Sequence, residues 1–443
     1  MSTAGFRIDA GWVVTPDDDG GVQVLTGVTV AVRGTRIEYV GPEAGLPEPL
    51  RSLERVNARD GIVIPGFVNT HNHAAMTLLR SYADDLPLMR WLQEKIWPAE
   101  AHLTGEDVYW GTLAACAEQI RSGITAFADM YFFMDDAARA VDASGMRAQL
   151  SRGLVAVTPG ADRALREGVE LFERWHGHDD DRITVALAPH APYTCPDDFV
   201  REVLAEARRL EAPIHTHLAE TLDEIRQLEE QRGLTPIQWA VQVGLVERPV
   251  LAAHCVHLTA EDIGLLAEHR IAASHNPISN QKLASGVAPV VQMRQRGALV
   301  ALGTDGACST NHLNFFEEMR SAAWLQKVTR MDASALPAPE VFRMATVDGA
   351  RALGYPDVGR VREGYRADLV VLDASAVHMA PRHDVVSLVV YSAQTADVRD
   401  VWIHGRPVLR DRQIVTFDER RAVEECRRRG LRLAERAAAA AGS

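Results

Sequence analysis

Short apolar runs alternate with segments of helical periodicity along most of the chain, and this alternation predicts the architecture. Eight runs bounded by Gly, Pro or polar residues are typical of buried strands; they cover residues 62–70, 123–130, 146–153, 183–189, 213–218, 250–254, 271–275 and 299–304. Helical segments lie between them, among them residues 108–122, 197–210, 221–231 and 259–268. Eight strand–helix units in succession predict an α/β fold of the (β/α)8 TIM-barrel type.

The two ends of the chain carry a different pattern, of short strands without long helices. The expected strands cover residues 6–15, 21–32 and 36–40 at one end and 367–372, 387–391, 398–403 and 407–409 at the other. Because these ends flank the barrel, we expect them to meet in one small β-sandwich. The expected division is residues 1–60 for its N-terminal part, 61–364 for the barrel, and 365–443 for its C-terminal part plus a terminal helix within residues 418–441.

Histidines and an aspartate stand at the C-terminal ends of several predicted barrel strands: His71, His73, His217, His254, His275 and Asp305. In a parallel barrel the active site lies at that end and is built from several strands. Residues two apart in a strand point to the same side, so the imidazoles of His71 and His73 leave their strand together.

Four of these side chains form a ligand set for one divalent cation: His71, His73, His217 and Asp305. Three imidazoles and a carboxylate suit Zn²⁺ first, with Fe²⁺ or Mn²⁺ as alternatives. A second metal needs a bridging ligand, often a modified lysine at the end of the fourth strand, and none of the chain's three lysines is near that point. We therefore expect one metal ion, which lowers the pKa of a bound water to about 7.

Three residues near this set can handle protons. Glu220 follows His217 by three residues, in the loop above the same strand, where a carboxylate can move a proton between water and substrate. His254 can hydrogen-bond the water or the developing anion, and Asp305 can accept the water proton. Alone, Glu220 would be an ordinary acid at the start of a helix, where a negative charge is favourable; the strand-end histidines favour the catalytic role for Glu220, His254 and Asp305.

Composition and charge limit the kinds of partner and the cellular location that we expect. The net charge of −13 argues against a nucleic-acid partner. No run of about eighteen apolar residues is present, so no membrane partner is expected. The first residues lack the apolar core of a signal peptide, and the five dispersed cysteines fit reduced thiols. We expect a cytoplasmic protein that acts on a small molecule.

Six motifs carry a resemblance that covers nearly the whole length of the chain: residues 65–73, 76–100, 188–193, 215–220, 274–277 and 303–307. With them the sequence resembles the amidohydrolase superfamily and, within it, the 5-methylthioadenosine/S-adenosylhomocysteine deaminases. The metal motifs are shared across the superfamily, whereas the segment 76–100 is more discriminating. The resemblance implies hydrolytic deamination of the 6-amino group of adenosine thioethers, and it allows a homo-oligomer.

The resemblance also assigns substrate contacts. Glu100 would accept hydrogen bonds from the ribose hydroxyls, as a carboxylate does from two adjacent donors, and His190 would contact the purine edge. Arg152 would meet the homocysteine carboxylate, with Arg163 as a second candidate, and Trp91 would cover the site as an apolar lid. Glu220 would also protonate N1 of the purine and Asp305 would face the reacting carbon, so both would contact substrate.

Other interpretations of the same residues remain. Glu100 could pair with a nearby arginine, and Trp91 could serve packing alone. The same metal site could act on a ring without ribose, such as a guanine-type purine, a pterin or a chlorinated triazine, for which Glu100 has no use. A catalytically silent scaffold barrel would be expected to have lost metal ligands, and the full set is present. No Gly-x-Ser-x-Gly motif supports a serine hydrolase.

Overall fold

Eight parallel strands form the larger body of the protein. The computed structural model describes residues 5–157 and 159–441, and its barrel strands are β5 (Phe67–Asn69), β6 (Ile124–Tyr131), β7 (Arg147–Leu154), β8 (Ile183–Pro189), β9 (Ile214–Leu218), β10 (Val250–His254), β11 (Ala272–His275) and β12 (Val300–Leu302). They pair in chain order, and the Thr70 amide donates to the Leu302 carbonyl at 2.9 Å, which joins the first strand to the last. The predicted barrel is confirmed.

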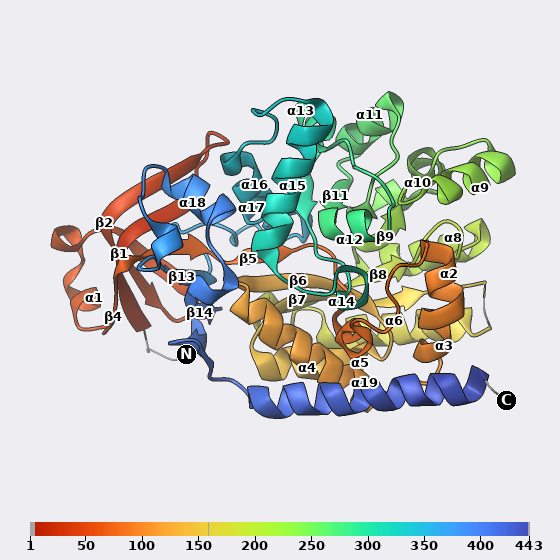
Figure 1. Ribbon diagram of the computed structural model, residues 1–443, viewed down its shortest axis with the longest axis horizontal. Helices are drawn as coiled ribbons and strands as arrows, with labels where there is room; N and C mark the ends of the chain where they lie inside the picture. The colour runs from red at the N-terminus through yellow and green to blue at the C-terminus, as the bar shows by residue number, and fades with distance from the viewer. Residues whose placement is uncertain (1–4, 158, 442–443) are drawn as a thin grey trace.

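Most helices lie around this barrel, whereas the first helix lies beside the N-terminal strands, at the far left of Figure 1. Their bounds are α1 (Glu48–Arg51), α2 (Leu88–Trp91), α3 (Trp97–Glu100), α4 (Gly105–Arg121), α5 (Met134–Ser144), α6 (Ala161–Trp175), α7 (His178–Asp181), α8 (Asp197–Leu210), α9 (Leu222–Arg232), α10 (Pro236–Val243), α11 (Ala260–Glu268), α12 (Pro277–Lys282), α13 (Val290–Gln295), α14 (Ala307–Thr310), α15 (Phe315–Arg330), α16 (Ala338–Met344), α17 (Val347–Ala352), α18 (Val385–Tyr391) and α19 (Glu419–Ala441). The four predicted helical segments match α4, α8, α9 and α11.

The first predicted barrel strand, residues 62–70, is in fact two strands of two different sheets. β4 (Glu54–Pro65) belongs to the small sheet, and only β5 belongs to the barrel. The chain crosses between the sheets at Gly66, where an added Cβ would lie 2.1 Å from the Thr125 side chain. Only glycine fits that approach. Hydrophobicity alone did not show the break, because the run is buried on both sides of it.

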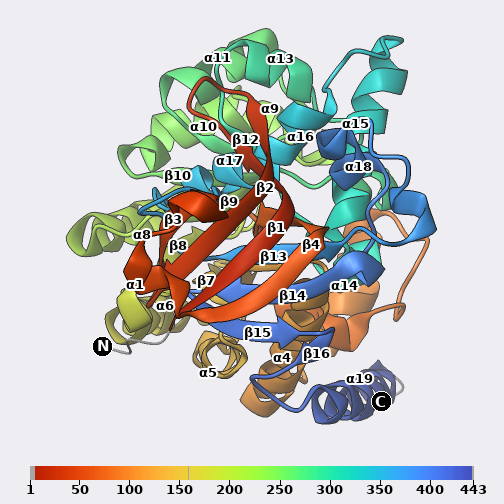
Figure 2. The ribbon, with the colours of Figure 1, turned by 90° about the vertical axis from the view of Figure 1, so that its left-hand side faces the viewer.

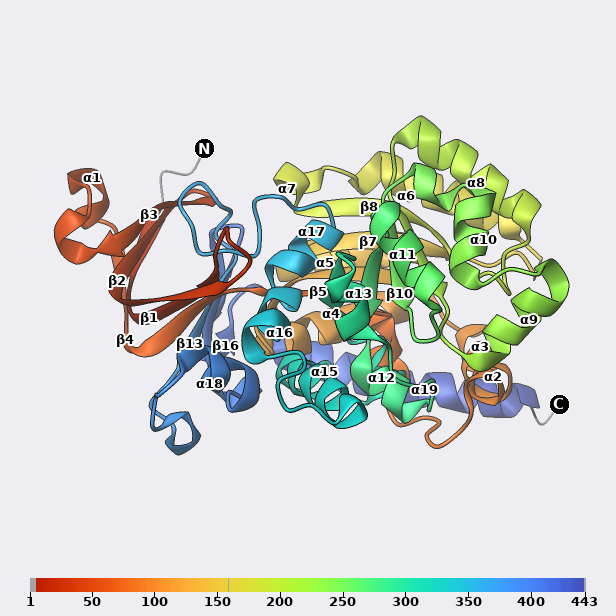
Figure 3. The ribbon, with the colours of Figure 1, turned by 90° about the horizontal axis from the view of Figure 1, so that it is seen from above.

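The two ends of the chain meet in the smaller body, as predicted (Figures 2 and 3). Its strands are β1 (Gly5–Pro16), β2 (Val22–Arg33), β3 (Arg36–Pro42), β4, β13 (Leu369–Asp373), β14 (Val398–Ile403), β15 (Arg406–Arg410) and β16 (Gln413–Ile414). Hydrogen bonds join them in one mixed sheet of order β16-β15-β14-β13-β4-β1-β2-β3. The sheet curls over its own core, since Phe6 of β1 stacks on Trp402 of β14 with ring centroids 4.8 Å apart.

One predicted strand of this body is a helix. Residues 387–391 lie within α18, where Asp384 accepts a hydrogen bond from the Ser387 amide and so caps the first turn. The buried residues are Val385, Val386, Val389 and Val390, a spacing that matches one face of a helix. A short apolar run rich in valine does not by itself distinguish a strand from a helix, and the strand prediction was wrong here.

Two polar connections fix the outer parts to the barrel. The terminal helix α19 contacts α4 along its length, and Asp107 of α4 receives hydrogen bonds from Arg429 and Arg436. Between the two bodies, the Arg147 guanidinium of β7 donates to the Asp368 carboxylate at 2.8 and 3.3 Å, with both side chains almost fully buried. In the described part of the chain, no helix is long and apolar enough to cross a bilayer.

Candidate active site

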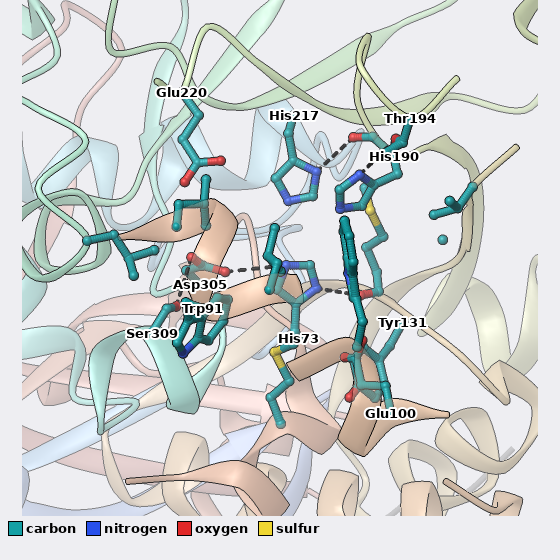
Figure 4. A pocket seen from close by; sticks show the side chains of 18 of the residues that line it. His73, Trp91, Glu100, Tyr131, His190, Thr194, His217, Glu220, Asp305 and Ser309 are labelled. Atoms are coloured by element: carbon teal, nitrogen blue, oxygen red, sulfur yellow. Dashed lines mark hydrogen bonds and ion pairs between the residues drawn. The ribbon is translucent and has the colours of Figure 1, made fainter. Parts of the chain in front are cut away.

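The predicted chemistry collects in one cavity at the C-terminal ends of the barrel strands. Its lining includes His73, His217, Glu220, His254 and Asp305. Figure 4 shows His73, His217, Glu220 and Asp305 facing a common space from several strands and loops. The strand ends converge because the barrel closes, which is the arrangement predicted from the repeated strand-end residues.

Three imidazoles turn the same ring atom towards the centre of this cavity. The Nδ1 atoms of His73 and His217 donate to the backbone carbonyls of Met130 and His190, at 2.5 and 2.8 Å. The Nδ1 of His71 lies 2.9 Å from the Nε2 of His215, and the Nε2 of His71 is buried with no hydrogen-bond partner in the described part of the chain. In each ring the Nδ1 atom is engaged and Nε2 is directed inwards.

Asp305 completes the group from the loop after β12. Its Oδ1 lies 3.5 Å from the His71 Nε2 and 3.3 Å from the His73 Nε2. Its Oδ2 accepts hydrogen bonds from the hydroxyls of Ser279 and Ser309, at 2.6 and 2.9 Å. Although burial opposes ionisation, the neighbouring imidazoles, above all that of His71, hold the Asp305 pKa well below its usual value. The carboxylate is therefore a fixed anion.

This set of atoms fits a divalent cation. Ligand atoms of His71, His73 and His217 lie within 4.8 Å of one another, as do those of His71, His254 and Asp305. Burial lowers the pKa of His71 to about 4 and that of His217 well below its usual value, so both rings are neutral, as metal coordination requires. The partnerless Nε2 of His71 is a buried polar atom that a metal ion would satisfy.

Glu220 and His254 lie on one side of this centre. Glu220 is only 4% exposed, which rules out the ordinary surface acid considered above. Burial raises the pKa of Glu220. The His254 Nε2 lies 3.8 Å from Glu220 Oε2. Burial works against its protonation, but the carboxylates of Glu220 and Asp305 outweigh burial and raise the His254 pKa.

The loop that carries Glu220 is fixed by a second acid. Glu224 accepts hydrogen bonds from the backbone amides of Ala219 and Glu220, at 2.9 and 2.8 Å. Thr221 caps the following helix by accepting from the Glu224 amide. The position of Glu220 is thus set by its backbone, and its carboxyl remains available to a ligand.

Glu100 lies across the cavity, on α3, and Figure 4 shows its carboxyl beside Tyr131. Burial raises the pKa of Glu100 to about 7, opposed by Tyr131. No cation pairs with Glu100 in the described part of the structure, so the interpretation of this acid as half of an ion pair is wrong. The Tyr131 hydroxyl is buried and has no well-aligned hydrogen bond within residues 5–157 and 159–441. Both groups can serve a polar ligand.

His190 and Trp91 line the same cavity. The His190 Nδ1 lies 3.0 Å from the Thr194 hydroxyl, and burial lowers the His190 pKa to about 3, so the ring is neutral with its other nitrogen available. Its carbonyl orients His217. Trp91 of α2 is 5% exposed and presents an apolar surface to the cavity. Its side chain can therefore pack against the protein and contact a ligand at the same time.

Arg152 and Arg163 lie outside this inner cavity, in an adjoining outer one that shares Glu100 and Trp97 with it. Both arginines meet the Glu167 carboxylate, Arg152 at 2.8 Å and Arg163 at 3.5 Å. The Arg163 side chain is 74% exposed. The structure thus separates the predicted substrate contacts into an inner group and an outer, ion-paired group.

Several residues around the site were not predicted: Ser151, His215, Glu224, Tyr131, Ser279 and Ser309. His215 alone carried a signal, because it precedes His217 by two residues and so points to the same side of β9. Ser151 lies within β7, Tyr131 ends β6, and Ser279 and Ser309 lie in the short helices α12 and α14. None of them belongs to a spacing pattern that would mark it in the sequence. Their roles follow from contacts between segments distant in the sequence.

The chain is similar to known proteins over nearly its whole length. A model of the Amidohydrolase family matches residues 62–408. The 5-methylthioadenosine/S-adenosylhomocysteine deaminase of Pelotomaculum thermopropionicum is 50% identical over 407 residues, covering 92% of this chain and 94% of that protein. A crystal structure of an adenosine deaminase from Xanthomonas campestris with bound zinc has a TM-score of 0.91 at 38% identity, covering 97% and 98% of the two chains. An atrazine chlorohydrolase from Arthrobacter aurescens, complexed with zinc, has a TM-score of 0.89 at 22% identity over 96% of this chain and 100% of that one, which shows a common fold.

Proposed function

The chain belongs to the amidohydrolase family, and from that premise we propose that it is a metal-dependent deaminase of adenosine thioethers. The substrates are 5′-methylthioadenosine, S-adenosylhomocysteine and related adenosines, and the products are ammonia and the inosine analogue. The relative that is 50% identical over nearly the whole chain carries this activity in its name.

One observation favours a ribose-containing substrate, which membership of the family alone does not decide. Glu100, a half-buried carboxyl without a cationic partner among the described residues, lines the same cavity as the imidazole cluster and Glu220. Withdrawing an acid from water is costly unless a ligand supplies donors, and two vicinal hydroxyls of a ribose supply two. A ring without ribose would leave Glu100 unsatisfied.

The proposed metal is zinc, coordinated by His71, His73, His217 and Asp305. When bound, it supplies a water activated for attack at neutral pH. Glu220 protonates N1 of the purine as water adds to C6. Asp305 accepts one proton of the attacking water and passes it to the amino group. As the C6–N bond breaks and ammonia leaves, the second proton of that water passes to the Glu220 carboxylate, which restores the acid.

His254 and His190 orient the reactants. His254 donates from Nε2 to the oxygen that adds to C6, supported on its other side by Asn280, whose Oδ1 lies 2.9 Å from the His254 Nδ1. His190 faces the purine edge. Trp91 excludes water from the apolar face of the cavity, which strengthens the electrostatic contacts inside it.

The outer cavity takes the 5′ substituent. A methylthio group needs only apolar surface, whereas a homocysteine arm carries a carboxylate and an ammonium group. In the proposal Arg152 exchanges its bond to Glu167 for the carboxylate, and Arg163 remains a peripheral second partner. Glu167, released from Arg152, then faces the ammonium group.

The test is ammonia release by zinc-loaded protein with paired substrates. Adenosine thioethers, adenosine and adenine are compared at equal concentration, first with the natural protein and then with Glu100→Ala. We expect turnover of the ribosylated compounds only, and an increased KM for them in the variant. Turnover of adenine that exceeds that of the nucleosides would refute the proposal.

A further inference from the structure

His71 is supported differently from the other two histidines of the cluster. The Nδ1 atoms of His73 and His217 meet backbone carbonyls, which only accept hydrogen bonds and therefore fix the proton on Nδ1. The His71 Nδ1 instead meets the imidazole of His215 at 2.9 Å. An imidazole can donate or accept a hydrogen bond. The tautomer of His71 therefore depends on the contact that the other ring nitrogen of His215, Nδ1, makes.

Ser151 lies behind His215 and determines the direction of this hydrogen bond. The Ser151 hydroxyl donates to the Asp129 carbonyl at 2.7 Å, which uses its only hydrogen. Its oxygen lies 3.5 Å from the His215 Nδ1 and can act towards that atom only as an acceptor. The proton of His215 is therefore on Nδ1, and its Nε2 is an acceptor.

Only one arrangement of the protons on His215 and His71 follows. His215, which is fully buried, carries one proton, because a second would create a cation in a dry interior with no carboxylate against it. With Nε2 of His215 accepting, the His71 proton lies on Nδ1, and the His71 Nε2 presents its lone pair to the centre of the cluster.

We propose that Ser151 and His215 form a tautomer-setting relay that prepares His71 as a metal ligand, with His215 as the positioning residue. The reversed arrangement would place a proton on the His71 Nε2, directed at Asp305 Oδ1 3.5 Å away, where it would block coordination. The relay rests on the metal site of the proposed function, and it extends that function to residues that touch neither metal nor substrate.

Two substitutions at His215 separate hydrogen bonding from packing. His215→Gln places an amide oxygen, an acceptor, near the position of the imidazole Nε2, whereas His215→Leu fills similar space without an acceptor. His275→Leu is the matched control, because His275 is also a buried barrel histidine, and its ring nitrogens have no hydrogen-bond partner among the described residues. Ser151→Ala removes the far end of the relay.

Zinc affinity is measured by competition with a chelator, without substrate, together with the visible absorption of the cobalt-substituted protein. We expect His215→Leu to weaken zinc binding about 10- to 100-fold, as loss of an outer partner of a metal-binding histidine does, and to alter the cobalt spectrum. His215→Gln should restore most of the affinity, and Ser151→Ala should give an intermediate loss. His275→Leu should bind as the natural protein does.

Two results would overturn the relay. Natural affinity and an unchanged cobalt spectrum in His215→Leu would show that His71 needs no such partner. Equal losses in His215→Leu and His215→Gln, with both variants folded by circular dichroism, would show that His215 acts through packing. Failure of the natural protein to bind zinc would instead refute the proposed function, so the two failures are distinguishable.

Discussion

Replacing Glu220 by Gln tests the assigned proton donor with little disturbance of its surroundings. The loop is fixed by Glu224 through the backbone amides of Ala219 and Glu220, which the substitution leaves intact. The Glu220 carboxyl lies 3.8 Å from the His254 Nε2, beyond hydrogen-bond distance, so no hydrogen bond between these side chains is lost. Gln keeps the shape of the side chain and loses only the exchangeable carboxyl proton.

The expected loss is therefore kinetic. General acid–base catalysis contributes about 10²–10⁴-fold, and a 100-fold loss in turnover corresponds to about 2.7 kcal/mol in the activation free energy. We expect Glu220→Gln to reduce kcat for methylthioadenosine at least about 100-fold, with zinc content and KM close to those of the natural protein. Ammonia release gives kcat and KM, and elemental analysis gives the zinc content.

Glu229→Gln provides the control, because Glu229 is exposed on α9, the helix that follows the loop of Glu220. It should behave as the natural protein does. A Glu220→Gln variant with kcat within a few-fold of the natural value would refute the assignment of Glu220. A variant that loses zinc in proportion to its activity would show that Glu220 supports the metal site rather than the proton transfer.

Three further predictions concern the substrate contacts and the fold. Because burial raises the Glu100 pKa to about 7 and only the ionised form accepts from both ribose hydroxyls, KM for nucleosides should fall as pH rises through about 7, and Glu100→Gln should remove this dependence. Arg152→Ala should raise KM for adenosylhomocysteine about 10- to 100-fold, since a hydrogen bond to a charged group is worth about 1.5–3 kcal/mol, and leave methylthioadenosine unaffected; equal changes for both substrates would contradict the outer-cavity role. Asp368→Asn should lower the free energy of unfolding by about 3–5 kcal/mol, because it leaves the Arg147 charge buried without its partner; urea unfolding measures this, and an unchanged midpoint would contradict it.

Regular apolar runs made most of the barrel predictable from sequence. Seven of its strands lie at the predicted positions, because each run is short, buried and bounded by polar or turn residues. The eighth prediction, residues 62–70, joined two strands, since a change of sheet at Gly66 leaves no mark on hydrophobicity. Residues 387–391 were predicted as a strand for a related reason: a short valine-rich run fits either state, and the helix is decided by the Asp384 cap.

The site was predictable where residues share a strand end and unpredictable where they meet only in space. His71, His73 and His217 were found because strand geometry directs them to one end of the barrel. The role of Arg152 rests on a family resemblance, and no sequence pattern indicates its ion pair with Glu167. The hydrogen bond between His71 and His215 joins residues 144 apart in the chain and follows only from barrel closure.

The most direct test of the central proposal is ammonia release by purified, zinc-loaded protein. The panel contains methylthioadenosine, adenosylhomocysteine, adenosine, adenine, guanine and a chlorotriazine, with chloride release followed for the last. Turnover confined to the ribosylated adenines is the predicted result, and it would support both the deaminase and the ribose-binding role of Glu100. Turnover of the free bases or the triazine alone would contradict the proposal and leave only the metal site standing.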